Sequence, residues 1–327
     1  MVRVLSDDDV ASVLELEALL PVVADAFEKQ RAGAVERPER PHYPIGTGTD
    51  PDAPGEPTGT GLCMPAYVHG AAYAATKLVT VVEGNPERGL PTVTAQIALA
   101  DAETGQPVGY LAGNRVTSAR TGCIGGLAAR ELATDEPIDL AVIGAGTQAR
   151  WQARAIAAAT DRLESIRVYS PSDSRTACAD DLEAELGVPA TPVSSPRDAV
   201  DGASVVVTAT TSTAPVFPGN ALADGTLVIA VGAYTPAMRE LDDATIDRAD
   251  RVFADVPNEA RETGDLRERA ALAVQPFGDV VAGRRGREAA SEIIVCKSVG
   301  TAVLDAAAAE FVFERARESG SGTAVTL

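Results

Sequence analysis

The chain of 327 residues carries a net charge of −19, and 45% of its residues are hydrophobic. This length predicts about two domains with a sizeable core. The acidic balance argues against nucleic acid or an anionic membrane as a partner, because both require a basic surface. Only three of the 28 basic residues are lysine, and an acidic, lysine-poor composition predicts adaptation to high salt.

The cysteines occur singly, with no C-x-x-C pair, and only two histidines are present. This usage predicts no metal site and indicates buried, reduced thiols in a cytoplasmic protein. The acidic N-terminus does not resemble a signal peptide, and no apolar run is long enough to predict a membrane span. The cysteines are Cys63, Cys123, Cys178 and Cys296.

The N-terminal part of the chain reads as a helix followed by a sheet. Residues 8–30 have amphipathic helical spacing, and the aspartates before them suit a helix start. Residues 46–60 are rich in glycine, proline and aspartate, which predicts a loop. The segments after this loop predict a mostly antiparallel sheet. The predicted strands are 61–68, 73–82, 92–101 and 107–113.

From Thr117 onward the pattern changes to helices that alternate with strands. Thr117 is a suitable N-cap for the helix after it, and a last helix is expected over residues 300–318. The alternation predicts an α/β fold, with a Rossmann-type, doubly wound parallel sheet and a mostly antiparallel α+β domain. The predicted parallel strands are 139–144, 165–170, 203–210, 226–232, 251–256 and 292–297.

A glycine-rich turn, GAGTQA at residues 144–149, joins the first of these strands to a helix. Gly144 permits the tight turn, Gly146 lets a pyrophosphate approach the backbone, and Ala149 allows close packing of helix on sheet. Free N–H groups at the helix start would face the phosphates. The alternative is a tight turn that binds nothing. The predicted dinucleotide contacts are Gly144, Ala145, Gly146, Thr147 and Gln148.

The next strand has no acidic residue at its end. A cofactor site for NAD usually has Asp or Glu here, which binds the ribose 2′-hydroxyl, whereas Ser170, Ser172 and Arg175 occupy this region. Hydroxyls with an arginine suit a 2′-phosphate, so the pattern favours NADP over NAD. The alternative is that Ser170 caps a turn and Arg175 is a solvated helix residue.

Lys77 lies within an otherwise apolar strand segment, 73–82. Strand alternation places it on one face with Tyr73, Ala75 and Val79, so we expect the amine to point into a water-poor region. Desolvation lowers the pKa of a lysine and makes it a usable acid or base. The alternative is a lysine whose amine reaches water at a strand edge.

Three arginines are candidates for binding an anion. Arg120 is expected in the first turn of the helix capped by Thr117, where a cation opposes the helix dipole unless an anion lies between them. Arg37 and Arg40 lie in a proline-stiffened segment, and a guanidinium there could bind a carboxylate through two hydrogen bonds. The alternative for each is an exposed arginine.

Taken together, these segments resemble the ornithine cyclodeaminase/mu-crystallin family over nearly the whole chain. The resemblance implies a homodimer with a substrate-binding and dimerisation domain at 1–122 plus 301–327, and an NAD(P)-binding Rossmann domain at 123–300. The stretches that carry it are MPAY, TKLVTVVEGNPERGLPTV, GNRVTSARTG, VIGAGTQARWQ, VGAYTPAMREL and CKSVGTAVLD.

The resemblance also implies roles for particular residues. Lys77 matches the active-site lysine, Arg40 matches a carboxylate-binding arginine better than Arg37 does, and Val299 lies where the family contacts substrate. Arg120 matches an arginine between substrate and cofactor, and the nicotinamide is expected to face Lys77. The positions that match cofactor contacts are Thr92, Thr147, Gln148, Ser170, Thr210, Val231 and Ser298.

One departure from the family pattern bears on the activity. Ornithine cyclodeaminases carry a catalytic aspartate and, four residues later, a lysine, where this chain has Tyr234 and Met238. The resemblance therefore implies an NAD(P)H-dependent reductase of imino acids, or the reverse amino-acid dehydrogenase. The alternatives are an ornithine cyclodeaminase, for which Tyr234 is a poor substitute, and a non-catalytic protein that binds NADPH and a small ligand.

Overall fold

A computed structural model describes residues 1–49 and 52–326. The chain divides into two compact units. Unit 1 comprises residues 1–15, 32–120 and 301–327, and unit 2 comprises residues 16–31 and 121–300. The α/β fold class predicted from the sequence is confirmed, since one unit contains a mostly antiparallel sheet and the other a parallel sheet.

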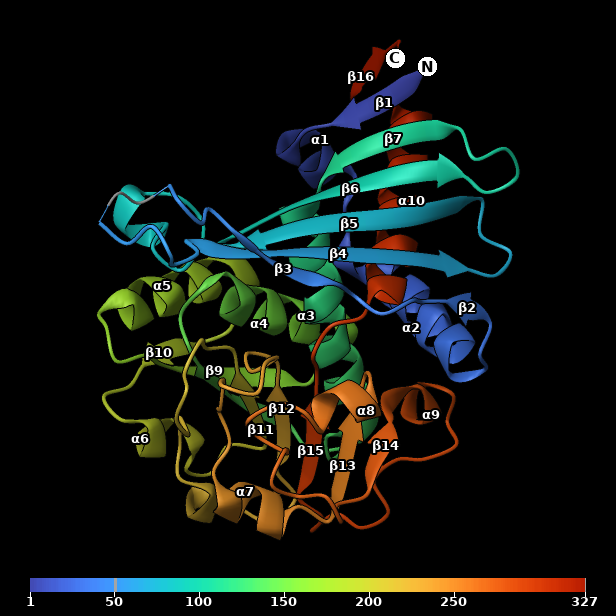
Figure 1. The fold of residues 1–327 in the computed structure, drawn as a ribbon. Helices are drawn as coiled ribbons and strands as arrows, with labels where there is room; N and C mark the ends of the chain where they lie inside the picture. Colours follow the sequence, from blue (N-terminus) through green and yellow to red (C-terminus); the bar gives the residue numbers. More distant parts are fainter. Residues whose placement is uncertain (50–51, 327) are drawn as a thin grey trace. The chain divides into compact units, whose positions relative to one another are not determined.

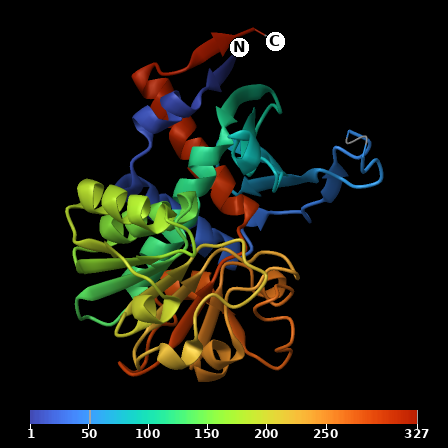
Figure 2. The same cartoon turned by 90° about the vertical axis from the view of Figure 1, so that its left-hand side faces the viewer.

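Unit 1 is built on a sheet with the strand order β16-β1-β7-β6-β5-β4-β2, and β3 pairs with β4. All pairs are antiparallel except β1 with β7, and β1 and β16 bring the two chain ends side by side (Figures 1 and 2). The strands are β1 (Val2–Leu5), β2 (Val35–Glu36), β3 (His42–Ile45), β4 (Gly59–Val68), β5 (Tyr73–Val81), β6 (Val93–Asp101), β7 (Pro107–Ala112) and β16 (Thr323–Val325). A short 3-10 helix, η1 (Pro86–Arg88), precedes β6.

The helix α10 (Ala302–Ser319) covers one face of this sheet and contacts β4 and β5 (Figure 1). Residues of β5 alternate between this buried face and the opposite one, as the sequence pattern predicts. Thr301 caps the start of α10 through its side chain, and Gly320 ends the helix in the left-handed conformation. This packing places the buried face of β5 against residues near the start of α10.

The helix predicted over residues 8–30 is wrong, because the structure has two helices there. These are α1 (Asp7–Val13), which starts with a capping box between Ser6 and Asp9, and α2 (Leu16–Arg31). Leu14 has an extended backbone that ends α1. The guanidinium of Arg315 donates to the carbonyl of Val13 and to the Glu15 carboxylate, which holds the chain at the break.

The predicted helix start at Thr117 is also wrong. The helix α3 runs over Gly113–Leu132 and follows directly on β7. Gly113 lies so close to the Ala95 backbone that a Cβ atom would approach its carbonyl carbon to 2.8 Å, which explains a glycine at this junction. Arg120 therefore lies in the interior of a helix, and the helix-dipole argument for it does not hold.

Unit 2 is built on a sheet with the order β10-β9-β8-β11-β12-β15-β13-β14, in which every pair is parallel. All residues of β11, β12 and β15 are buried, as expected for central strands covered on both faces. The strands are β8 (Ile138–Ile143), β9 (Leu163–Tyr169), β10 (Ala190–Pro192), β11 (Val205–Thr208), β12 (Leu227–Ala230), β13 (Arg251–Ala254), β14 (Val274–Pro276) and β15 (Ile294–Lys297).

The connections of unit 2 are helical, as a parallel sheet requires (Figure 1). A Cβ atom on Gly122 or Gly126 of α3 would lie 2.6 Å or 2.4 Å from a carbonyl oxygen of α4, so the absence of side chains here allows the two helices to pack closely. The helices are α4 (Thr147–Ala159), α5 (Ser174–Leu186), α6 (Pro196–Val200), η2 (Gly219–Ala221), α7 (Asp243–Arg248), α8 (Pro257–Ala260) and α9 (Phe277–Val281).

The helix α2 belongs to unit 2, although the family resemblance implies that these residues lie in the substrate-binding domain. The helix packs on α4 and α9, with the rings of Phe27 and Phe277 edge to face at 5.1 Å. Arg31 Nε donates to the Asp279 carboxylate at 2.6 Å. The break between α1 and α2 is therefore the point where the chain leaves one unit for the other.

The cysteines are free thiols, of which Cys63 is half-buried and the other three are buried. Burial raises the pKa of the Cys123 thiol to about 12, so this thiol stays protonated and unreactive at neutral pH. Among residues 1–49 and 52–326, no helix has both the length and the apolar character needed to span a bilayer.

Candidate active site

Lys77 is buried in unit 1 and has an aspartate as its partner. Its side chain is 2% exposed, and its Nζ lies 2.6 Å from Asp305 Oδ2. Lys77 comes from β5 and Asp305 from the first turns of α10, so the packing of helix on sheet brings them together. Burial lowers the pKa of Lys77 from 10.5 to about 8, although the Asp305 carboxylate opposes the change and the nearby Arg120 adds to it.

Asp305 also binds Arg120, which makes a cluster of three buried charged groups. The Nε of Arg120 donates to Asp305 Oδ1 at 2.8 Å, and both side chains are at most 5% exposed. Burial alone would raise the pKa of Asp305, but the two neighbouring cations lower it, so the carboxylate is ionised. Sequence reasoning missed Asp305; the available signal was an aspartate directly before four alanines, in the segment VLDAAAAE.

The cluster carries a surplus positive charge and has an unused hydrogen-bond donor. Two cations face one carboxylate, which leaves a formal charge of +1 in a water-poor environment. The Nη1 atom of Arg120 is buried, and no hydrogen-bond acceptor for it exists within the described ranges 1–49 and 52–326. A buried donor without an acceptor costs free energy, so the arrangement suits an anionic ligand that supplies one.

Arg40 contributes to the same electrostatic environment. Its positive charge lowers the pKa of Lys77, which places its side chain within electrostatic range of the cluster. Arg40 and Arg37 are both half-buried and precede β3.

Thr92, predicted to contact the cofactor, is half-buried in unit 1, and its carbonyl accepts from the Val82 N–H at 2.9 Å.

The glycine turn of unit 2 has the geometry expected of a phosphate-binding turn. Gly144 has a φ of +114°, and a Cβ atom there would lie 2.5 Å from the Ala209 carbonyl oxygen, so only glycine fits. A Cβ on Gly146 would meet nothing within 4 Å, and Gly146 is exposed. Gly146 is the N-cap of α4 and no side chain caps that helix, while Ala149 is fully buried against the sheet. The helix start thus offers free N–H groups to an anion.

Hydroxyl groups and an arginine gather at the end of β9. The Ser170, Ser172 and Ser174 hydroxyls lie within 2.6–3.3 Å of one another. Arg175 Nη1 donates to the carbonyls of Ser170 and Ser172 at 3.0 Å, which fixes the guanidinium beside them. Ser170 is buried, whereas Ser172 is exposed and Arg175 is half-buried. The fully exposed carboxylate of Asp173 lies 3.6 Å from Arg175 Nη2.

The remaining predicted cofactor positions lie at the carboxyl ends of the central strands of unit 2. Thr210 follows β11, Val231 follows β12, and Ser298 follows β15. Asp255 accepts from the Ser298 hydroxyl at 2.7 Å and from the Val299 N–H at 3.0 Å, which fixes the chain after β15. Parallel sheets bind ligands at this edge.

Tyr234 and Met238 both lie half-buried in the loop after β12. Within the described residues no group of three or more His, Cys, Asp or Glu side chains is arranged to hold a metal ion.

One unit contains a parallel sheet with a dinucleotide-type glycine turn, and the other contains two buried cations that share one carboxylate. These features define an α/β protein of the cofactor-binding class. The chain matches the ornithine cyclodeaminase/mu-crystallin family over residues 2–320. It is 35% identical over 276 residues to a Delta(1)-pyrroline-2-carboxylate reductase of Bacillus cereus, covering 81% of this chain and 84% of that protein. The chain belongs to the ornithine cyclodeaminase/mu-crystallin family.

Two solved structures are similar over almost their whole length. One is Thermococcus litoralis Delta(1)-pyrroline-2-carboxylate reductase in complex with NADH and L-proline, with a TM-score of 0.91, 29% identity, and coverage of 99% of this chain and 100% of that chain. The other is an archaeal alanine dehydrogenase dimer with bound NAD, with a TM-score of 0.88, 28% identity, and coverage of 100% and 99%. The resemblance predicted from the sequence is confirmed.

Proposed function

We propose that this protein is an NAD(P)H-dependent reductase of imino acids, which in reverse acts as an amino-acid dehydrogenase. The relatives named pyrroline-2-carboxylate reductase and alanine dehydrogenase support the reaction class. The observation that carries the proposal is the buried cluster of unit 1, with its surplus positive charge and the unused Nη1 donor of Arg120. A substrate carboxylate would supply both the missing charge and the missing acceptor.

The residues of unit 1 would bind the substrate and manage its proton. Arg120 and Arg40 would hold the carboxylate, and the ammonium of Lys77 would donate a proton to the imine nitrogen, directly or through a water molecule. Asp305 keeps the amine of Lys77 oriented through the 2.6 Å contact. In the reverse direction the neutral amine of Lys77 would accept the proton.

The residues of unit 2 fit a nicotinamide dinucleotide. The open space at Gly146 and the uncapped start of α4 suit the pyrophosphate, and the Ser170 region suits the adenosine ribose. When bound, the reduced nicotinamide supplies a hydride to the carbon next to the substrate carboxylate. Thr210, Val231 and Ser298 stay proposed contacts of the nicotinamide half, and Val299 stays a proposed substrate contact.

The proposed function is tested by following NADH and NADPH oxidation with pyrroline-2-carboxylate, piperideine-2-carboxylate and pyruvate plus ammonia, in molar salt because of the acidic composition. We expect turnover with at least one of these substrates. Release of ammonia and proline from ornithine without net cofactor consumption would instead identify a cyclodeaminase, in spite of Tyr234. Tight cofactor binding without turnover of any substrate would identify a binding protein.

The serine and arginine cluster after β9 predicts a preference for NADPH over NADH. We expect Arg175→Ala to raise the Kd for NADPH by about 10-fold, because a charged hydrogen bond to the 2′-phosphate is lost, while the Kd for NADH stays within about twofold. Fluorescence titration of the reduced cofactors measures both constants. Arg154→Ala is a matched control, since Arg154 is held by an ion pair to Glu185 on the next helix. Equal losses for both cofactors would refute the assignment.

The lowered pKa of Lys77 predicts the pH dependence of the reaction. Its amine is charged below about pH 8 and neutral above it. We therefore expect kcat/KM for imine reduction to fall as the pH rises through about 8, whereas kcat/KM for amino-acid oxidation rises over the same range. Initial rates across pH 6–10 measure both profiles, and the residual rate of a Lys77→Met variant should lack this transition. A reduction profile that is flat across pH 8 would exclude Lys77 as the proton donor.

A homodimer is proposed from the family and from the dimeric archaeal neighbour. The sheet face of unit 1 opposite to α10 supports the proposal, because the large apolar side chains Val4, Leu78 and Tyr110 on it are 39–40% exposed. Cross-strand pairing places these side chains on the same face. Light scattering in molar salt tests the dimer.

A further inference from the structure

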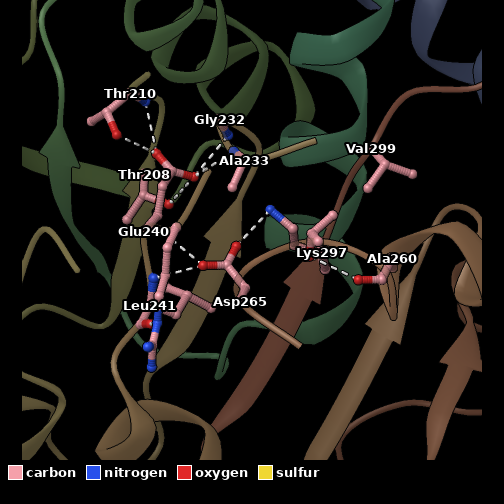
Figure 3. Close-up of polar contacts among 12 residues, drawn as sticks. Thr208, Thr210, Gly232, Ala233, Glu240, Leu241, Ala260, Asp265, Lys297 and Val299 are labelled. Atoms are coloured by element: carbon pink, nitrogen blue, oxygen red, sulfur yellow. Dashed lines mark hydrogen bonds and ion pairs between the residues drawn. The ribbon is translucent and has the colours of Figure 1, made fainter. Parts of the chain in front are cut away.

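A buried carboxylate joins the ends of two central strands in unit 2 (Figure 3). Glu240, in the loop after β12, is fully buried. Its two oxygens accept five hydrogen bonds, from Thr208 Oγ1 at 2.9 Å, Thr210 N at 2.7 Å, Thr210 Oγ1 at 2.9 Å, Gly232 N at 2.8 Å and Ala233 N at 3.2 Å. The carboxylate thus binds the chain after β11 and the chain after β12 at the same time.

Glu240 is itself held from the other side by a buried ion pair. Asp265 Oδ1 accepts from the backbone N–H of Glu240 at 2.7 Å and from that of Leu241 at 2.9 Å. Asp265 Oδ2 lies 2.8 Å from Lys297 Nζ, and both of these side chains are completely buried (Figure 3). Lys297 is the last residue of β15, so three neighbouring strands are connected through one chain of polar contacts.

This network lies beside the positions proposed to bind the cofactor. Thr210 donates to Glu240 directly, Val231 precedes Gly232, and Ser298 follows Lys297. A shift of the chain after β11 or after β12 would therefore displace the proposed nicotinamide contacts.

Packing of the core alone does not require this arrangement of buried charges. Buried charges are expensive to desolvate, and apolar residues of similar size would stabilise a core at least as well. Position 232 also requires glycine, because a Cβ there would lie 2.3 Å from Glu240 Oε1. A network of buried hydrogen bonds anchored by an ion pair instead fixes one precise backbone position, which a ligand site needs.

We propose that Glu240, supported by Asp265 and Lys297, is a positioning residue for the cofactor: it fixes the strand ends that bind the nicotinamide half of the dinucleotide. The proposal rests on the proposed function, since it assumes that unit 2 binds a dinucleotide. It predicts that loss of the Glu240 carboxylate weakens binding of the whole cofactor but spares the adenosine half, which the glycine turn and the Ser170 region would hold.

The test is the variant Glu240→Gln, whose amide N–H₂ would face N–H donors and break one side of the network. We expect the Kd for the preferred reduced cofactor to rise about 10-fold or more, with a parallel rise in cofactor KM, while the Kd for ADP-ribose stays within about twofold. Isothermal titration calorimetry measures both. Thr208→Val removes one hydrogen-bond donor to Glu240 with little change of shape, and it is the test variant if Glu240→Gln does not fold. It should also weaken cofactor binding while sparing ADP-ribose binding, with a smaller rise in Kd.

Glu292→Gln is the matched control. Glu292 accepts from Arg251 at 3.0 Å just before β15 begins, at the opposite edge of the same sheet. This control should lower the melting temperature without changing either Kd. Unchanged cofactor binding in folded Glu240→Gln, or an equal loss for cofactor and ADP-ribose, would overturn the positioning role. Wild-type protein that binds neither NADH nor NADPH would overturn the proposed function itself.

Discussion

Replacement of Lys77 by methionine is expected to lower kcat for imine reduction by about 100-fold or more, the usual contribution of a positioned general acid. Methionine keeps the volume and apolar chain of lysine but removes the ammonium that lies 2.6 Å from Asp305. It also removes one positive charge, so the cluster becomes neutral and the KM for the carboxylate substrate should rise. Steady-state rates at pH 7 with the best imine of the panel measure both effects.

The same substitution at Lys29 is the control for this prediction. Lys29 is 38% exposed and pairs with Asp25 one helical turn away, so Lys29→Met should leave kcat and KM unchanged. Cofactor affinity, measured by fluorescence, should stay within about twofold in both variants, because the proposed dinucleotide contacts lie largely in unit 2. A Lys77→Met protein that binds cofactor and keeps full turnover would refute the role of Lys77.

Replacement of Asp305 by asparagine is expected to lower the free energy of unfolding by about 3–5 kcal/mol, because it leaves buried cations without their counter-charge. Asparagine keeps the shape and one acceptor oxygen, so the loss reports on charge rather than on volume. Burial and the neighbouring Arg120 already depress the pKa of Lys77, and without Asp305 that pKa should fall further. Urea unfolding at pH 7 measures the stability, and the pH–rate profile of any active fraction measures the shift.

A double variant separates this explanation from general damage to the core. If the unpaired cations cause the loss, Lys77→Met together with Asp305→Asn should be less destabilised than the sum of the single variants, because one of the two cations is gone. Glu15→Gln breaks an exposed ion pair to Arg315 in the same unit and should cost little. Strictly additive losses would show that the cluster does not act as an electrostatic unit.

The fold was largely predictable because its main signals are local. The apolar runs that become β8, β11, β12 and β15 are nearly continuous, which is typical of strands buried on both faces. The edge strands were missed, since β10 and β14 have three residues each and β16 is exposed throughout. The break between α1 and α2 was missed because a contact from Arg315, far along the chain, stabilises it.

The structure brings together Lys77 and Arg120, two of the residues proposed from the sequence, but their pairing with Asp305 was not predicted. Lys77 was identified by its scarcity and by strand alternation, and its burial agrees with that reasoning. Arg120 was selected for a wrong reason, since it lies within α3 and is bound by Asp305. Asp305 and Lys77 are separated by more than two hundred positions, and only the packing of α10 on β5 brings them together.

The lysine content has a clearer meaning in the structure than in the sequence. Two of the three lysines, Lys77 and Lys297, are buried and paired with an aspartate, and only Lys29 reaches the surface. Depletion of lysine therefore concerns the surface, whereas the two buried positions retain a compact cation. Both buried pairs lie next to residues that we propose to bind substrate or cofactor.

The central claim is that hydride passes between a nicotinamide and the carbon beside the substrate carboxylate, with unit 1 holding the imino acid. The direct measurement uses reduced cofactor carrying deuterium at both positions of C4. The substrate is pyrroline-2-carboxylate or the best imine of the panel, and the product is analysed by mass spectrometry and NMR. We predict one deuterium at the α-carbon of the amino acid for each labelled hydride transferred, and formation of this labelled product about 100-fold more slowly in Lys77→Met. Formation of an unlabelled product, or proline arising only from ornithine with release of ammonia, would contradict the account.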